Sequence, residues 1–107
     1  MMKLMTKAIE KKFLKNSNDK IESVFQKKVI VKFFAPWISP WTWFAVEGQK
    51  LEDGDWRFYG LVFGHEKEFG YFLLSELESV NGPFGLKIER DLYFDNPTIE
   101  EVLNRGH

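Results

Sequence analysis

The sequence predicts a single α+β domain that spans residues 1–107. Apolar side chains alternate with a two-residue period between residues 29 and 74, which predicts an antiparallel meander of about four strands. Capping patterns lie on both sides of this region, so we expect an N-terminal helix and short C-terminal helices. A chain of this length buries about 65% of its unfolded surface, which is enough for one core.

The first predicted element is a helix that Thr6 caps and that ends at about Lys15. Its apolar stripe consists of four residues: Ala8, Ile9, Phe13 and Leu14. Its solvent-facing positions hold four lysines: Lys7, Lys11, Lys12 and Lys15. The sequence NSND at residues 16–19 is typical of a break after such a helix.

Four strands are expected, at residues 29–35, 41–47, 56–63 and 70–74. Pro36 ends the first strand, and a connection with a second proline leads to the next. A polar loop containing Asp53 and Gly54 joins the second strand to the third. The third strand has apolar side chains on both faces: Trp56, Phe58 and Val62 on one, Tyr59, Leu61 and Phe63 on the other. We therefore expect helices and the C-terminal segment to cover both faces of the sheet.

The C-terminal third contains two helix-start patterns. Ser75 with Glu78 has the spacing of a capping box, and so does Thr98 with Glu101. Each pattern predicts one short helix. Residues 85–94, between them, are expected to be partly extended.

Aromatic residues are concentrated in the segment FFAPWISPWTWF, where six of the twelve residues from 33 to 44 are aromatic. Such rings form either the centre of a core or the floor of a binding surface. We expect Trp43 and Phe58 in the core. Trp37 and Trp41 flank a connection that contains proline, so we expect their rings to be partly exposed and to anchor a partner.

The charges are unevenly distributed. Residues 1–32 hold nine lysines and three acidic residues, a net charge of +6, and the remaining six basic and thirteen acidic residues give −7. This pattern is compatible with a basic face for phosphate, and also with two parts that neutralise each other. No apolar run reaches the ~20 residues of a membrane span, and the N-terminus lacks a signal-peptide core, so no membrane partner is expected.

Few residues offer chemistry. The chain has no Cys and two His, His65 and His107, so we expect no zinc site and no other cofactor. The lack of Cys fits a cytoplasmic protein. A Mg²⁺ site built from carboxylates remains an alternative. Ser75 as a nucleophile would need His65 as its base, and its capping role already accounts for it.

Three segments carry a resemblance to a known family: VKFFAPWISPWTWFAVE, FYGLVFGHEKEFGYFLLSELESV and GPFGLKIERDLYF. They resemble the bacterial domain-of-unknown-function family 2958. Phe44, Phe69 and Leu74 depart from its usual Tyr, Leu and Ser. The resemblance implies a small protein of plasmids, phages and conjugative elements with an accessory role. It implies no activity, cofactor or catalytic residue.

The leading hypothesis is a non-catalytic binding protein that acts on a host or element protein. The candidate contact residues are Trp37, Trp41, Glu47, His65, Glu66, Glu68, Glu89, Arg90 and Asp91. One alternative is a nucleic-acid-binding protein that uses the lysines of the first helix. The other is a small enzyme that uses Glu66, Glu68 or the run from Glu89 to Asp91.

Overall fold

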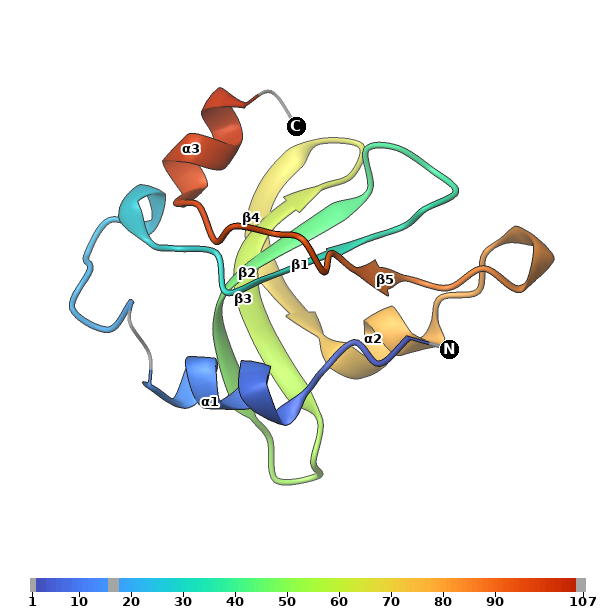
Figure 1. Ribbon diagram of the computed structural model, residues 1–107, viewed down its shortest axis with the longest axis horizontal. Helices are drawn as coiled ribbons and strands as arrows, with labels where there is room; N and C mark the ends of the chain where they lie inside the picture. Colours follow the sequence, from blue (N-terminus) through green and yellow to red (C-terminus); the bar gives the residue numbers. More distant parts are fainter. Residues whose placement is uncertain (1, 16–17, 106–107) are drawn as a thin grey trace.

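The computed structural model describes residues 2–15 and 18–105, so Asn16, Ser17 and His107 of the sequence predictions lie outside it. Its described part contains one antiparallel sheet in the order β4-β3-β2-β1-β5 (Figure 1). The strands are β1 (Val31–Phe34), β2 (Thr42–Lys50), β3 (Trp56–Phe63), β4 (Lys67–Leu73) and β5 (Glu89–Arg90). The α+β meander is confirmed, with a short fifth strand because β5 pairs with β1 in the segment that we expected to be partly extended.

Among the described residues, three α-helices and two 3-10 helices surround the sheet. They are α1 (Lys7–Lys15), η1 (Val24–Gln26), α2 (Leu74–Ser79), η2 (Pro83–Gly85) and α3 (Ile99–Asn104). The Thr6 cap is confirmed, because the Ile9 amide donates to the Thr6 hydroxyl at 3.2 Å. The predicted stripe of α1 is partly wrong: Ala8 and Leu14 are exposed, Leu14 to 76%, and the helix buries Ile9 and Phe13 alone.

Each face of the sheet carries its own core, as the two-sided third strand predicts. Trp56 and Phe58 belong to the first core, with α1 and α2 packed on it. Leu61 and Phe63 belong to the second core, with α3 packed on it and η1 at its edge. Phe58 is fully buried, as expected. Trp43 is only half-buried, so its assignment to the core interior is wrong.

A β-bulge interrupts the pairing of β2 with β3. Ala45 lies opposite Gly60 and Glu47 lies opposite Tyr59, so Val46 is the extra residue. Val46 and Glu47 are consecutive, yet both lie on the side of the second core, because Val46 belongs to that core and Glu47 lies opposite Tyr59. Beyond the bulge Gly48 faces α1, where an added Cβ would lie 3.0 Å from the Phe13 ring.

The two predicted capping boxes have different outcomes. At α3 the box is confirmed: the Glu101 amide donates to the Thr98 hydroxyl at 3.2 Å, and the Thr98 amide donates to Glu101 Oε1 at 3.0 Å. At α2 the prediction is wrong, because Glu76 rather than Glu78 accepts the amide hydrogen bond, from Leu73 at 2.8 Å. The helix therefore begins before Ser75. In the described ranges, no helix has the length and apolar character to cross a bilayer.

Candidate functional site

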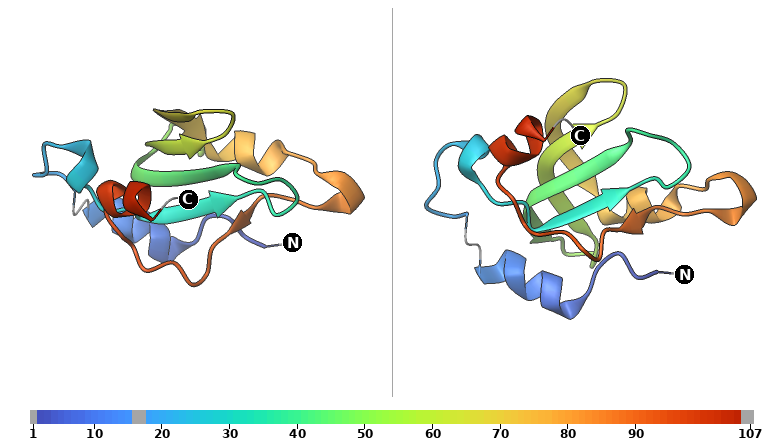
Figure 2. Two further views of the ribbon diagram at one scale, coloured as in Figure 1. Left: turned by 90° about the horizontal axis from the view of Figure 1, so that it is seen from above. Right: turned by 45° about the horizontal axis from the view of Figure 1, so that its top comes forward.

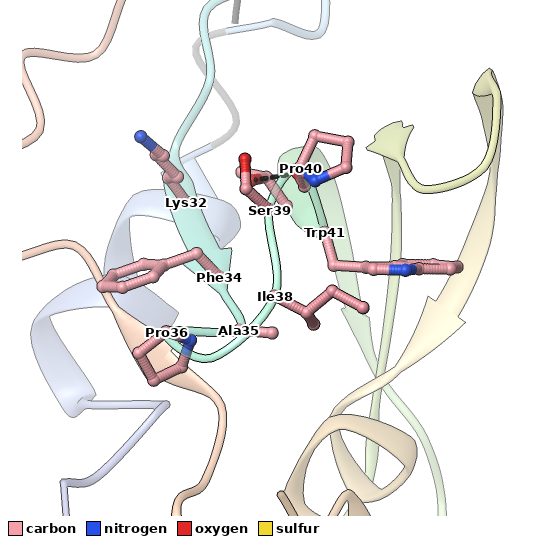
Figure 3. Close-up of a pocket in the computed structure, with 9 residues that line it drawn as sticks. Lys32, Phe34, Ala35, Pro36, Ile38, Ser39, Pro40 and Trp41 are labelled. Atoms are coloured by element: carbon pink, nitrogen blue, oxygen red, sulfur yellow. Dashed lines mark hydrogen bonds between the residues drawn. The ribbon is translucent and has the colours of Figure 1, made fainter.

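The connection between β1 and β2 forms a tight loop in which Pro36 and residues 38–40 are exposed. The Ala35 amide donates to the Trp41 carbonyl at 3.0 Å, and the Thr42 hydroxyl donates to the Pro40 carbonyl at 2.7 Å. The Ser39–Pro40 peptide is cis. Figure 3 shows Ile38 and Trp41 directed to one side of this loop and Phe34 to the other. The loop surrounds an open pocket of about 440 Å³ that Phe34, Ile38 and Trp41 help to line.

Trp41 also lines a second open pocket, of about 320 Å³, on the side of the β3–β4 turn. Its ring centroid lies 5.8 Å from that of Trp43 and 5.5 Å from that of His65, which it meets edge to face. The indole rests on Gly64, where an added Cβ would lie 2.5 Å from the ring. The glycine therefore lets the loop and the turn come together around one tryptophan.

Two carboxylates form the rim of this second pocket, Glu66 and Glu68. Both are exposed, and no Lys or Arg of the described chain lies within 4 Å of either one. Glu68 lies opposite Val62 and so shares the face of Trp43. Lys67 points to the opposite face, with its ammonium group 5.0 Å from the Phe63 ring centroid. The lining of the pocket therefore combines an indole ring with two carboxylates.

The structure brings Trp41, His65, Glu66 and Glu68 together and leaves the other candidates elsewhere. Trp37 is partly exposed, as expected of both indoles, but its ring rests on Gly82, where an added Cβ would lie 2.6 Å away. Glu47 does not join the loop. It lies beyond the bulge, where its carboxylate pairs with Lys27.

The run from Glu89 to Asp91 is divided between the two faces of the sheet. Arg90 pairs with Phe33 on the first-core face, and its buried Nε has no hydrogen-bond partner. The Asp91 carboxylate lies 3.5 Å from the Lys32 ammonium group. In the described part of the chain these three side chains form no ion pair with one another. The run is therefore not a carboxylate pair facing one cleft.

Ser75 and His65 do not form a nucleophile and base. The Ser75 hydroxyl donates to Asp55 Oδ2 at 2.6 Å, and the Ser75 amide donates to Oδ1 at 3.0 Å. The hydroxyl hydrogen bond is the main reason that the pKa of Asp55 lies below its usual 3.8. Within residues 2–15 and 18–105, no three His, Asp or Glu side chains are grouped as a metal ion would require.

Sequence reasoning missed the residues that carry no polar group. Val62 and Gly64 line the pocket beside Trp41, and Gly82 supports Trp37. The contact between Trp41 and Gly64 could have been inferred from the β2–β3 register. When Thr42 lies opposite Phe63, Gly64 comes to lie opposite Trp41.

Fold and site together define a small single-sheet α+β protein with open pockets lined by aromatic and acidic residues. The chain belongs to the family described as "Protein of unknown function (DUF2958)", whose model matches residues 4–101. No curated protein and no solved structure matches the chain.

Proposed function

We propose that the protein is a non-catalytic binding protein that holds a basic segment of a partner protein at the Trp41 pocket. One observation carries this proposal: Trp41 lies between two open pockets, and Glu66 and Glu68 border the second without a counter-ion from the described chain. A binding surface with unpaired carboxylates favours a cationic ligand through charge complementarity.

The chemistry of the pocket fits a lysine or arginine side chain. A cation over an indole face gains about 0.5–1 kcal/mol at an exposed site and about 2 kcal/mol or more when it is desolvated. Carboxylates at the rim add charge-assisted hydrogen bonds and faster association. The prolines at 36 and 40 restrict the loop, so that little further ordering is needed on binding.

Binding is favoured over carboxylate catalysis because Glu66 and Glu68 lie exposed in an open pocket. A general acid or base is normally tuned by burial or by close neighbouring charges. For the cellular setting we propose an accessory role on a mobile genetic element, with a host or element protein as the partner. The family resemblance supports that setting.

A randomised peptide library displayed on phage tests the proposal directly. We expect the selected peptides to be enriched in Lys and Arg. The double variant Glu66→Gln/Glu68→Gln should bind them about ten- to hundredfold more weakly at low salt. The matched control, Glu52→Gln/Glu78→Gln, removes the same charge from exposed positions elsewhere and should bind as the wild type does. Selected peptides without basic residues, or equal loss in both variants, would contradict the proposal.

A further inference from the structure

A groove runs between α1 and the segment that connects β5 to α3. In Figure 2 this segment follows β1 on the side where α1 lies. The first part of the groove has a volume of about 220 Å³ and is lined by Lys12, Lys15, Lys28, Val29, Ile30 and Asn96. The second part, of about 150 Å³, shares three of these residues and extends to Arg90, Leu92 and Phe94. The shared residues make the two parts continuous.

Cationic groups line the groove along its length. Lys12, Lys15 and Lys28 are exposed, and none of the described carboxylates lies within 4 Å of their ammonium groups. Arg90 lines the second part and keeps a buried Nε without a hydrogen-bond partner. Asp91 also lines that part, and its carboxylate is engaged by Lys32 at 3.5 Å.

Charge neutralisation within the chain is selective. Lys27 pairs with Glu47 and Lys32 pairs with Asp91, so two lysines of the basic N-terminal third are compensated by the acidic remainder. Lys28 lies between them in sequence and faces the groove instead. Three lysines without an ion pair to the described chain, Lys12, Lys15 and Lys28, therefore lie together at this groove, and Lys7 and Lys11 are exposed on the same helix as Lys12 and Lys15.

The floor of the groove is held in place before any ligand binds. The Asn96 side-chain amide donates to the carbonyls of Val29 and Ile30 at 2.9 and 3.1 Å. The Lys28 backbone amide donates to Asn18 Oδ1 at 2.8 Å, and Asn18 Nδ2 donates back to the Lys28 carbonyl at 2.9 Å. A preformed site loses little conformational entropy on binding.

We propose that this groove binds the phosphate backbone of single-stranded nucleic acid. Lysines and an arginine at successive positions suit successive phosphates. The apolar floor at Val29 and Ile30 suits sugars or bases, which a duplex would keep paired and stacked. Tyr93 lies in the chain between the lining residues Leu92 and Phe94 and is 94% exposed, so its ring is available as a stacking platform for an unpaired base.

Fluorescence anisotropy with a labelled oligothymidylate of about 15 nucleotides, repeated over a salt series, tests this inference. We expect the logarithm of the binding constant to fall linearly with the logarithm of salt concentration, with a slope of about −2 to −3 for three or four phosphate contacts. The variant Lys12→Gln/Lys15→Gln/Lys28→Gln should bind more weakly and show a slope nearer zero. The matched control Lys20→Gln/Lys50→Gln/Lys87→Gln carries the same charge change elsewhere and should keep the steeper slope.

Two further measurements separate backbone binding from simpler alternatives. Tyr93→Ala should weaken binding about tenfold and leave the salt slope unchanged, because stacking involves no counterion release. Inorganic phosphate at the same phosphate concentration should not compete. Effective competition by phosphate, equal binding of duplex DNA, or equal slopes for the two lysine variants would overturn the inference. Glu66→Gln/Glu68→Gln should bind the oligonucleotide at least as well as the wild type, so this test is independent of the peptide-binding proposal.

Discussion

The two faces of the sheet are stabilised in different ways. On the first face α1 and α2 cover a core of aromatic rings, in which Phe58 contacts Phe13, Phe33 and Phe72 at centroid distances of 5.5–5.6 Å. On the second face the main cover is α3, a helix of six residues. There the buried Asn18 bonds to the carbonyls of Lys28 and Val46.

This difference shows how a short covering segment is held. The α3 helix buries two residues, Ile99 and Val102, whereas α1 and α2 together bury four on the first face, so α3 supplies less apolar area. Hydrogen bonds supply the rest, through the Thr98 capping box and the Asn96 amide. A face covered by few apolar residues depends more on polar contacts whose partners must all be present.

The largest expected loss of stability comes from a substitution in the aromatic core of the first face. Phe58→Ala removes a fully buried ring and should lower the free energy of unfolding by about 3–5 kcal/mol, measured by urea denaturation. Trp43→Ala is the matched control: Trp43 is larger but only partly buried, so its truncation should lower the free energy of unfolding by less. If the two variants lose the same stability, the aromatic core does not centre on Phe58.

On the second face, Asn18→Ala should lower the free energy of unfolding by roughly 2–4 kcal/mol, because the Lys28 amide and the Val46 carbonyl lose their buried partner. Asn81→Ala, at an exposed position, should cost a few tenths of a kcal/mol. A near-neutral Asn18→Ala would show that polar contacts do not hold this face.

Helix caps offer a comparison of one element on each face. Thr98→Ala should cost about 1 kcal/mol and speed amide hydrogen exchange in α3, while α1 keeps its protection. Thr6→Ala should produce the reverse pattern. Equal acceleration in both helices from either variant would indicate that the two faces unfold together.

The smallest expected change in stability comes from Asp55, and it depends on pH. Hydrogen bonds from Ser75 keep the folded-state pKa of Asp55 below 3.8, so the stabilisation is complete above the unfolded pKa and is lost as pH falls through the folded pKa. Asp55→Asn should therefore lower the melting temperature by a few degrees at pH 7. That difference should narrow below about pH 4. A difference that stays constant down to pH 2 would contradict this role of the carboxylate.

Local patterns predicted the local parts of the fold. The alternation in β3 and the Thr98 capping box depend on neighbouring residues, and both are confirmed. The prediction of a Ser75 cap was wrong because the Ser75 hydroxyl donates its hydrogen bond to Asp55, twenty residues earlier in the chain. The pairing of Phe33 with Arg90 joins distant residues, and a two-residue strand leaves no periodicity to detect.

The candidate site was predictable in pieces. His65, Glu66 and Glu68 are close in sequence; the first two are exposed in the β3–β4 turn, and Glu68 is exposed near the start of β4. Their meeting with Trp41 depends on the β2–β3 register, which the sequence alone does not define. Glu47 was predicted as a contact residue together with the loop, and in a strand without a bulge its side chain would lie on the same face as those of Trp43 and Ala45. The bulge and the Lys27 ion pair direct it elsewhere.

The extra residue at Val46 divides β2 into two halves of opposite phase. Before it, odd-numbered side chains such as Ala45 face the first core; after it, the even-numbered Gly48 occupies that side. Deleting Val46 would remove the bulge and leave Glu47 directly after Ala45, on the second-core side that Glu47 already occupies. Residues 47–50 would keep their present faces, and the loss would be the buried Val46 side chain together with the local irregularity of the strand. The bulge therefore marks a position where β2 can be shortened by one residue without a change of phase.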